Sequence, residues 1–321
     1  MFEGNGKRVF IHEVVARDGL QIEPVFLPTE KKIALINALS HLGFAKIEVT
    51  AFASPKAIPS LHDAEAVMRG IERVPGVCYV GHVPNLRGAE RAMSVRVDEV
   101  NVVMSVSETH NLANLRMTRE QSFRQLAEVI KTIGPSGVGI NASLSTCFGC
   151  PMEGEIAEEE LWRWVSRLLE AGALGITLCD TTGMAHPSQV ARVVGEYRRR
   201  WPAAVLTLHL HNTRGLGLAN ILAALTVGAD RFDTALGGSG GCPYAPGATG
   251  NVCSEDVTHM LEALGYKTGV DLSALLECAR SLPALVGHAV PGQVAKAGRI
   301  CDLHPGPDGL SEVRARAYAR G

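Results

Sequence analysis

The chain has 321 residues, 46% of them hydrophobic and 20% charged, a composition that supplies a large core and excludes an intrinsically disordered protein. Its 31 basic and 33 acidic residues give a formal charge of −2 without long runs of one sign, so we expect neither nucleic acid nor an anionic membrane as a partner. No stretch approaches the roughly 20 apolar residues of a membrane span, and the first residues lack an apolar signal core, which together predict a cytoplasmic protein whose partner is a small molecule.

Short apolar runs alternate with amphipathic stretches along the chain, which is the pattern of repeated strand–helix units. Several runs are continuously apolar and rich in β-branched residues, as parallel strands covered on both faces require. Eight strands are expected, at Val9–Val15, Lys46–Thr50, Val77–Val83, Glu99–Ser105, Val138–Ser143, Gly175–Cys179, Val205–His211 and Arg231–Leu236. Eight such units favour an α/β fold of the (β/α)₈ TIM-barrel type over a doubly wound sheet, which usually carries a glycine-rich phosphate loop after its first strand.

The expected helices carry their own end signals. Thr29 is expected to cap the first helix and Gly43 to end it in the left-handed conformation. Thr118 followed by Gln121 predicts a capping box ahead of another helix. Apolar residues at helical spacing predict the faces that pack on the core: Ile33, Ile36, Leu39 and Leu42 in the first helix, and Leu161, Trp164, Leu168 and Leu169 in a later one.

The sequence beyond the eighth strand departs from the simple repeat. A glycine-rich loop covers residues 237–251, and extra helical sequence then runs to about residue 298. We take residues 1–298, with that loop and those C-terminal helices, as one barrel domain. The tail, 299–321, contains Pro305, Pro307 and many Arg and Ala residues, and we expect it to be appended or loosely held.

The eight cysteines are too dilute for a disulfide scaffold and are interpreted as thiols. Cys147 and Cys150 form a Cys-x-x-Cys pair, but no second pair or nearby histidine completes a zinc site. Ordinary packing in a loop is therefore expected for this pair.

Polar residues gather at the expected carboxyl ends of the first and seventh strands, where barrel enzymes place their catalytic groups. Arg17 and Asp18 follow the first strand, and His209 and His211 lie on the seventh. Alternation along a strand points both imidazoles to the same face. A single histidine in a strand is more often a hydrogen-bonded core residue, but the nearby carboxylate of Asp18 favours a metal site.

Asn251 is a candidate fourth ligand through its amide oxygen. Two imidazoles, one carboxylate and an amide oxygen leave positions open for a bidentate substrate, and the absence of a thiolate from this set favours Mg²⁺ or Mn²⁺ over a closed zinc site. Glu48 and Asp180 also lie at or near strand ends, where a buried charge needs a partner. They are candidates either for catalysis or for ion pairs with Arg17 or Lys56.

Cys242 lies among glycines and directly before a proline, after the eighth expected strand. Two interpretations stay open for it. A flexible loop would let the thiol reach over the barrel mouth as a reactive group, whereas a buried thiol would serve packing alone, because reactivity depends on pKa and exposure.

Six sequence strings, in the same order, resemble those of the 3-hydroxy-3-methylglutaryl-CoA (HMG-CoA) lyase family. They are residues 16–21 (ARDGLQ), 47–50 (IEVT) with 54–56 (SPK), 147–151 (CFGCP), 180–183 (DTTG), 209–211 (HLH) and 241–251 (GCPYAPGATGN). The resemblance extends from about residue 8 to 298. Its last string is the most specific, whereas His-x-His is shared most widely within the metallolyase barrel superfamily.

The resemblance implies a role for each candidate residue. Asp18, His209, His211 and Asn251 match divalent-metal ligands, Arg17 a polarising cation, Glu48 and Asp180 supporting acids, and Cys242 a mobile catalytic cysteine. The implied reaction is retro-Claisen cleavage of a 3-hydroxyacyl-CoA to acetyl-CoA and a keto acid, with acetoacetate as the keto acid in leucine degradation. The implied partners are an acyl-CoA substrate and a second copy of the chain, as a homodimer.

That reaction gives each of these groups a chemical task. The substrate's tertiary hydroxyl must lose its proton, to His209 or to Asp180 through it, while a divalent cation stabilises the alkoxide. The leaving fragment is a thioester enolate, which Arg17 would stabilise and Cys242 would protonate on carbon.

The chain departs from the pattern of the family at two places, and other activities stay open. Residues 212–215 read NTRG where the family often has DTYG, and residues 22–24 read IEP where it often has NEK. Changes at Ile22, Asn212 and Arg214 could select another acyl group, such as citramalyl-CoA, which would yield acetyl-CoA and pyruvate. More distant alternatives are a Claisen-condensing enzyme of the same superfamily, a metal-independent cysteine hydrolase using Cys242, and a barrel that only binds its ligand.

Overall fold

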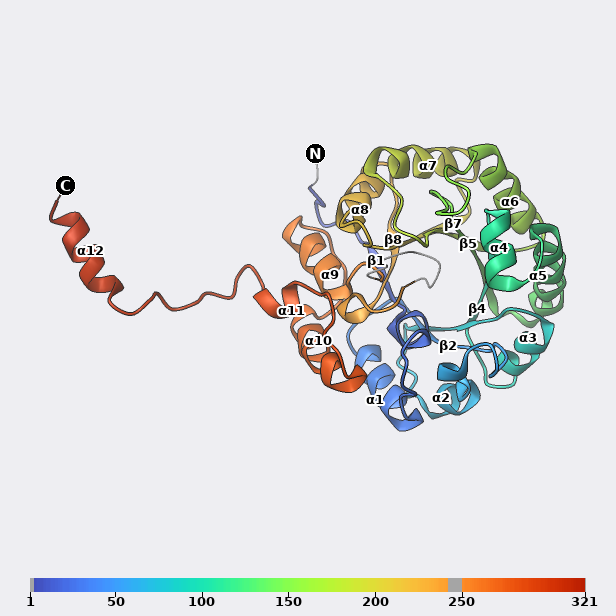
Figure 1. Ribbon diagram of the computed structural model, residues 1–321, viewed down its shortest axis with the longest axis horizontal. Coiled ribbons are helices and arrows are strands. Elements are labelled where there is room, and N and C mark those ends of the chain that lie inside the picture. The colour runs from blue at the N-terminus through green and yellow to red at the C-terminus, as the bar shows by residue number, and fades with distance from the viewer. Residues whose placement is uncertain (1–2, 242–249, 321) are drawn as a thin grey trace.

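The computed structural model describes residues 3–241 and 250–320 (Figure 1). In this part of the chain eight parallel strands close into a barrel in sequence order. Their bounds are β1 Phe10–Glu13, β2 Lys46–Ala51, β3 Cys78–His82, β4 Glu99–Ser105, β5 Gly139–Ser145, β6 Gly175–Asp180, β7 Val205–Leu210 and β8 Arg231–Thr234. Pairing of β1 with β8 closes the ring. All eight expected strands are present with ends shifted by at most two residues, and the predicted (β/α)₈ barrel is confirmed.

Helices surround the barrel on its outside (Figure 1). They are α1 Thr29–Ser40, α2 Ala64–Gly70, α3 Leu86–Met93, α4 Glu108–Leu115, α5 Arg119–Ile133, α6 Glu158–Glu170, α7 Pro187–Arg200 and α8 Gly217–Thr226, followed by α9 Ser254–Ala263, α10 Leu272–Val286, α11 Val294–Ala297 and α12 Leu310–Tyr318. The extra helices α9 and α10 pack on each other, and α10 also contacts α1. An extended segment separates α12 from the barrel. None of the helices in the described ranges has the length and apolar character needed to cross a membrane.

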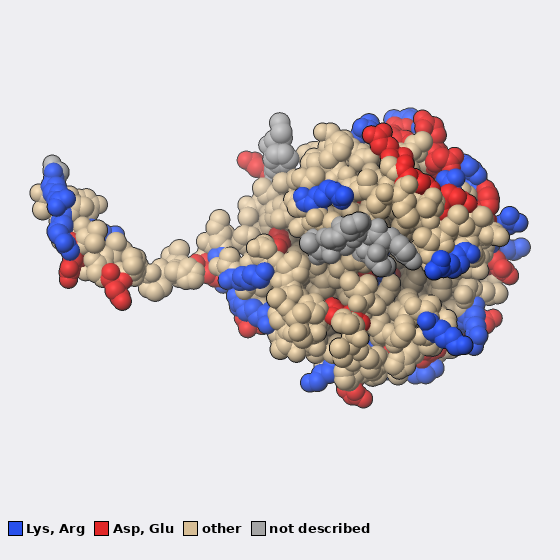
Figure 2. All heavy atoms as spheres, in the orientation of Figure 1, with Lys and Arg blue, Asp and Glu red and all other residues tan. Residues whose placement is uncertain are grey.

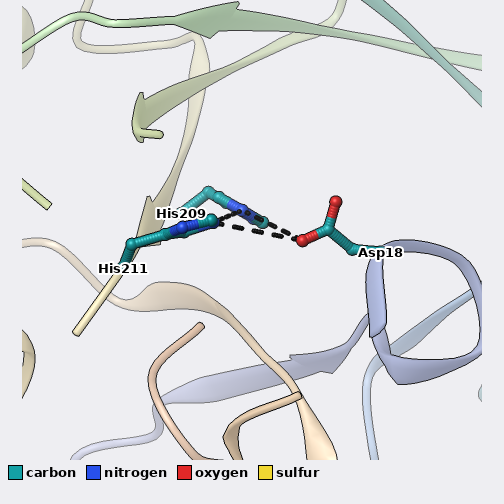
Figure 3. A group of neighbouring side chains, drawn as sticks. All are labelled: Asp18, His209 and His211. Atoms are coloured by element: carbon teal, nitrogen blue, oxygen red, sulfur yellow. Dashed lines mark hydrogen bonds and ion pairs between the residues drawn. The ribbon is translucent and has the colours of Figure 1, made fainter. Parts of the chain in front are cut away.

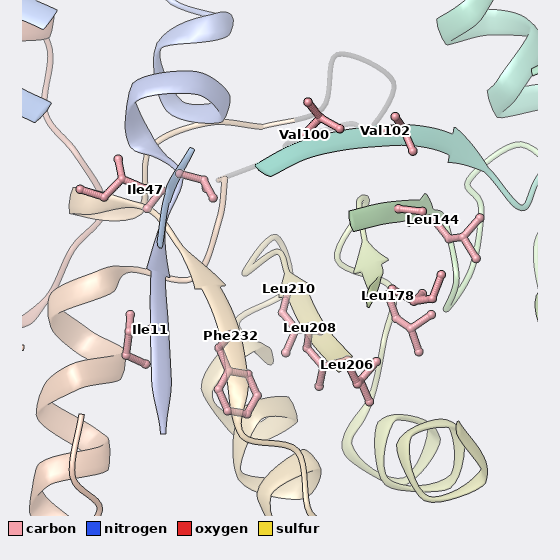
Figure 4. Close-up of a cluster of buried hydrophobic side chains, with 14 of the residues drawn as sticks. Ile11, Ile47, Val100, Val102, Leu144, Leu178, Leu206, Leu208, Leu210 and Phe232 are labelled. Carbon is pink, nitrogen blue, oxygen red and sulfur yellow. The ribbon is translucent and has the colours of Figure 1, made fainter. Parts of the chain in front are cut away.

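The hydrophobic core lies between the strands and the surrounding helices (Figure 4). On β7, Leu206, Leu208 and Leu210 belong to this layer and are at most 1% exposed, while Thr207 and His209 alternate with them and point into the barrel. The same alternation recurs on β4, where Val100 and Val102 are fully buried in the outer layer and Asn101 between them points into the barrel. Buried side chains of this layer, labelled in Figure 4, also include Ile11, Ile47, Val100, Val102, Leu144, Leu178 and Phe232.

The barrel interior is polar and hydrogen-bonded, in contrast to that outer layer. Asn141 Nδ2 donates to Asn101 Oδ1 (3.0 Å) and to Thr177 Oγ1 (2.9 Å), and Ser143 Oγ donates to the same Asn101 oxygen (2.8 Å). Outside the barrel, basic and acidic side chains of the described residues are interspersed on the face shown in Figure 2.

The expected helix ends are partly confirmed. Thr118 and Gln121 form the predicted capping box, and Gly43 has the predicted positive φ of 91°. The predicted cap at Thr29 is wrong, because the helix begins at this residue and Pro28 holds the cap position. The Thr29 hydroxyl instead donates to Asp63 Oδ2 (2.8 Å), since a buried carboxylate from a neighbouring element is a stronger acceptor than the local backbone can offer.

Glu13, at the carboxyl end of β1, holds together the ends of the first and last strands. Its Oε1 accepts a hydrogen bond from Leu236 N (3.0 Å), and Ser254 Oγ lies 2.7 Å from its Oε2. Ser254 Oγ also contacts Thr234 Oγ1 (2.7 Å), which donates to His12 O (3.1 Å). Each hydroxyl has a single proton, and that of Thr234 is donated to His12 O, so Ser254 must donate its own proton to Thr234. Ser254 then has none left for Glu13, and the hydrogen bond between them forms only if Glu13 is protonated and donates to Ser254. Burial raises the pKa of Glu13 to about 8, in agreement with a neutral acid at pH 7.

The Glu13→Gln variant tests this protonation. Because the folded pKa of about 8 lies above the ordinary value of 4.5, the folded chain binds this proton more tightly than the unfolded chain does. The resulting stabilisation is complete below about pH 4.5 and is lost as pH rises to about 8. Glutamine keeps a donor and an acceptor but does not titrate. We therefore expect the free energy of unfolding of the variant to fall less steeply than that of the parent chain as pH rises from about 4.5 to about 8. Urea unfolding from pH 5 to 8.5 measures both slopes, and equal slopes would place the titration on another group.

Candidate functional site

Asp18, His209 and His211 converge at the carboxyl end of the barrel (Figure 3). Asp18 lies in η1, a π-helical turn at Val15–Gly19 directly after β1, and the histidines lie at the end of β7 and just beyond it. The two Nε2 atoms are 3.1 Å apart, and Asp18 Oδ2 lies 3.9 Å from that of His209 and 4.0 Å from that of His211. Both histidines are buried. Three side chains from the carboxyl ends of β1 and β7, which flank β8 in the barrel, thus aim their ligand atoms at one point.

Asn251 joins this group although it comes from the segment after the glycine-rich loop. An isolated bridge pairs Asn251 with His211, and Asn251 Nδ2 donates to Asp18 Oδ2 (2.8 Å) and to Ser239 O (2.9 Å). The preceding Gly250 has a φ of 88°, and a side chain there would collide with the backbone oxygens of neighbouring glycines. Glycine is therefore what lets the chain bring Asn251 to the end of β7.

The donor set fits a hard divalent cation. The ligand atoms of Asp18, His209 and His211 all lie within 4.8 Å of one another. Asn251 Oδ1 is buried without a hydrogen-bond partner among the described residues, and a buried polar atom of this kind calls for an explanation such as a bound ion. Carboxylate, amide and imidazole donors without a thiolate suit Mg²⁺ or Mn²⁺.

Arg17 places a positive charge beside this point. Its Nε donates to Glu48 Oε2 and its Nη1 to Asp18 Oδ1, each at 2.6 Å, and Asn101 Nδ2 donates to the other Glu48 oxygen (3.0 Å). Although burial opposes ionisation of Asp18, the charge of Arg17 and the adjacent imidazoles lower its pKa to about 2. Glu48 is therefore an ion-pair partner of Arg17, and Asp18 is ionised at neutral pH.

Asp180 ends β6 and closes the turn that follows it. Its Oδ1 accepts hydrogen bonds from Met184 N (2.8 Å) and Ala185 N (3.1 Å), whereas its Oδ2 is buried without a partner among the described residues. Burial raises the pKa of Asp180 to about 6. No ion pair joins it to Arg17 or Lys56 in the ranges that the structure covers, so its free oxygen is available to accept a proton.

Two residues beside the site, the buried His12 and the partly buried Asp233, were not singled out from the sequence. Asp233 Oδ2 lies 3.3 Å from His209 Nδ1 and its Oδ1 lies 2.9 Å from His12 Nδ1. Although burial opposes its ionisation, hydrogen bonds from both rings hold the pKa of Asp233 below its ordinary value. A charged residue inside the short strand Arg231–Thr234 is the signal that could have found it, since a buried charge needs partners.

Arg214 and Asn212, two of the residues at which the sequence departs from the family pattern, form hydrogen bonds within the loops that follow the strands. Arg214 Nη1 donates to Thr182 O (3.0 Å) and Gly183 O (2.8 Å), which ties the loop after β7 to the loop after β6. Asn212 Oδ1 accepts from the backbone of Gly217, at the start of α8. Ile22 is 46% exposed, between η1 and α1.

The cysteines singled out from the sequence fall into two groups. Cys147 and Cys150 are buried thiols; Cys147 Sγ donates to Leu144 O (2.8 Å) and Cys150 Sγ accepts from Ser107 Oγ (3.1 Å). Cys242 lies outside the described residues. The described chain resumes at Gly250, next to the ligand group.

Comparisons with known proteins match this chain to one family of lyases over nearly its whole length. A family model described as HMGL-like matches residues 8–282. The hydroxymethylglutaryl-CoA lyase YngG of Bacillus subtilis is 44% identical over 287 residues, which cover 89% of this chain and 96% of that protein. The (R)-citramalyl-CoA lyase of Chloroflexus aurantiacus is 38% identical over 302 residues, covering 91% and 95% respectively. A solved structure of an HMG-CoA lyase from Acinetobacter baumannii, in complex with coenzyme A and 3-methylmalate, is 53% identical with a TM-score of 0.90, covering 94% of this chain and 98% of that one.

Proposed function

Because the chain belongs to the HMGL-like family, we propose that it is a divalent-metal-dependent carbon–carbon lyase that cleaves HMG-CoA to acetyl-CoA and acetoacetate. The resemblance seen in the sequence is confirmed by relatives that match over 89% and 94% of this chain. The observation that carries the proposal is the convergence of Asp18, His209 and His211 beside Arg17 at the carboxyl end of the barrel.

The ligand group sets up the first step, removal of the substrate's hydroxyl proton. We assign Asp18, His209, His211 and Asn251 to hold the cation, which when bound lowers the pKa of an oxygen that it contacts, as it lowers that of water from about 15.7 to about 7. A ring nitrogen that holds a cation has no lone pair left for a proton. His209 is therefore the base only if the other three residues hold the cation, and otherwise the free oxygen of Asp180, whose pKa is about 6, accepts the proton.

Arg17 and Cys242 serve the second half of the reaction. Breaking the carbon–carbon bond leaves a thioester enolate, and the guanidinium of Arg17, fixed by Glu48, stabilises the negative charge on its oxygen. We assign Cys242 to donate a proton to the enolate carbon, which gives the methyl group of acetyl-CoA. The thiolate then regains a proton from solvent, and no covalent intermediate forms.

Citramalyl-CoA is the second candidate substrate. It is supported by the citramalyl-CoA lyase among the relatives and by 3-methylmalate, a short hydroxy diacid, in the complex of the A. baumannii protein. Arg214, which spans two loops at the barrel mouth, and the exposed Ile22 are the residues that we expect to affect this choice.

Acetyl-CoA release from both thioesters, measured side by side with Mg²⁺, with Mn²⁺ and after chelation, tests the proposed function. Metal-dependent cleavage of HMG-CoA is the expected result. A higher kcat/KM for citramalyl-CoA would assign the chain to the second substrate. Thioester hydrolysis that persists in chelator would instead indicate a cysteine hydrolase, and no turnover of either compound would leave only a binding role.

Loss of a ligand is expected to separate metal binding from folding. In the His211→Ala variant we expect Mn²⁺ affinity, measured by calorimetry, to fall at least about tenfold, because even residues that only support metal ligands contribute that much. The matched control is His41→Ala, since this exposed ring at the end of α1 pairs only with Glu72 in the described residues. Equal Mn²⁺ affinities of the two variants would remove His211 from the ligand set.

The oligomeric state and the location in the cell are predictions. We propose a homodimer and a cytoplasmic location, in keeping with the intracellular acyl-CoA substrate that the A. baumannii complex with coenzyme A supports. Light scattering of the purified chain measures the first, and cell fractionation the second.

A further inference from the structure

His209, Asp233 and His12 occupy the same level of three adjacent strands. In the register of the barrel, His209 on β7 pairs with Asp233 on β8, and Asp233 pairs with His12 on β1. All three side chains point into the barrel, where His12 and His209 are 4% and 7% exposed. The carboxylate lies between the two rings, with Oδ1 at 2.9 Å from His12 Nδ1 and Oδ2 at 3.3 Å from His209 Nδ1.

This arrangement decides where the ring protons are. An ionised carboxylate can only accept hydrogen bonds, so each ring must carry a proton on the Nδ1 that faces Asp233. In a neutral His209 the remaining nitrogen, Nε2, then has a free lone pair, and it is this atom that faces Asp18 Oδ2 (3.9 Å) and His211 Nε2 (3.1 Å). The tautomer that Asp233 enforces is therefore the one that a cation requires.

The other histidine of the site shows by contrast that this support is particular to His209. His211 Nδ1 is buried and has no hydrogen-bond partner among the described residues, so no carboxylate orients that ring. His209 is thus the histidine whose lone pair is already aimed at the site, and His211 can donate its own Nε2 proton to it in the absence of a cation.

We propose that Asp233, held in place by His12, is a positioning residue that orients His209 and keeps its Nε2 as the electron-pair donor of the cation site. The proposal rests on the metal-dependent function proposed above. His12 contributes by satisfying Asp233 Oδ1, which fixes the carboxylate plane and leaves Oδ2 for His209. Groups that hold a metal-bound histidine in this way commonly account for about a 10- to 100-fold difference in metal affinity.

The experiment compares four variants without substrate: Asp233→Ala, Asp233→Asn, His12→Leu and the matched control Thr207→Val. Thr207 lies on the same inner face of β7, two residues before His209, and its near-isosteric replacement removes a polar group from the barrel interior. The first readout is the Kd of Mn²⁺. The second is the tautomer of His209, observed by ¹H–¹⁵N NMR of protein labelled at the histidine rings, and thermal unfolding checks that each variant is folded.

We expect Asp233→Ala to weaken Mn²⁺ binding about 10- to 100-fold and to remove the preference of His209 for a proton on Nδ1. Asp233→Asn should recover part of the affinity, because its amide oxygen can still accept from His209 Nδ1. His12→Leu should weaken binding less than Asp233→Ala does, and Thr207→Val should bind as the parent chain does. If Asp233→Ala does not fold, the ring spectrum of Asp233→Asn and the affinity of His12→Leu decide the question.

Outcomes for this proposal and for the proposed function are distinguishable. Equal Mn²⁺ affinities for Asp233→Ala and Thr207→Val, or an unchanged His209 tautomer in Asp233→Ala, would overturn the positioning role even if the chain cleaves HMG-CoA. A parent chain that binds Mn²⁺ with the predicted variant order but cleaves neither thioester would retain the positioning role and lose the proposed substrate.

Discussion

Replacing Arg17 by glutamine is expected to lower the kcat for HMG-CoA cleavage by about 10²- to 10³-fold, the range found when one group that stabilises a developing oxyanion is removed. The guanidinium is held by two carboxylates, Glu48 and Asp18, at 2.6 Å each, so it is fixed before the substrate arrives. Glutamine cannot carry the positive charge that the enolate requires. The measurement is steady-state kcat with saturating Mg²⁺ and substrate.

Two further variants show whether charge or geometry is responsible. Lysine at position 17 restores the charge but not the planar fork that reaches two carboxylates at once, so we expect only partial recovery. Arg91→Gln is the matched control, because Arg91 forms a two-pronged ion pair with Glu65 on neighbouring outer helices. If the Arg17 variant turned over as fast as the Arg91 variant, Arg17 would have no part in the chemistry.

The Cys242→Ser variant is expected to lose at least about 10² in turnover, the lower part of the range that a positioned general acid contributes. A thiol has an ordinary pKa near 8.5, whereas a serine hydroxyl is a far weaker acid and protonates the enolate carbon slowly. Mn²⁺ affinity should not change, because the assigned ligands lie elsewhere in the chain. Measuring kcat and the Mn²⁺ Kd on the same preparation separates the two effects.

Cys301→Ser provides the comparison for this result. Cys301 is an exposed thiol in the described residues, so its replacement removes an accessible sulfur without touching the barrel mouth. We expect this variant to keep the parent kcat. Should Cys242→Ser also keep it, the remaining interpretation of Cys242 is a packing thiol.

The strands could be predicted from sequence because their physical requirement is local. A parallel strand with helices outside must present apolar residues at alternate positions, as β7 does with Leu206, Leu208 and Leu210, and such a run is readable without its neighbours. The cap at Thr29 could not be predicted in the same way. Its hydroxyl bonds Asp63, 34 residues along the chain, and no local pattern indicates that partner.

The site residues likewise include some that local sequence predicts and some that it does not. Arg17 and Asp18 are adjacent in the sequence, and His209 and His211 share one face of a strand. Their spacing alone was therefore enough to predict that the members of each pair lie close together. The contacts that complete the arrangement cross the barrel closure: Asp233 meets His12 over a separation of 221 residues. Only the ring of strands, with β8 beside β1, brings such residues together, which is why Asp233 and His12 were missed.

The π-helical turn that carries Arg17 and Asp18 has a consequence for insertions and deletions. Gly19 N reaches back to Val14 O (3.4 Å), and this bond spans one residue more than the bond between residues four apart that defines an α-helix. Deleting one residue before Arg17, such as Ala16, would rotate the following side chains by about 100° around the helix axis. The guanidinium and the carboxylate would then leave Glu48 and the histidines although every functional residue was still present. Spacing within Val15–Gly19 is therefore under as strong a constraint as residue identity, and homologues of this chain should tolerate substitution at Ala16 far better than a change in length.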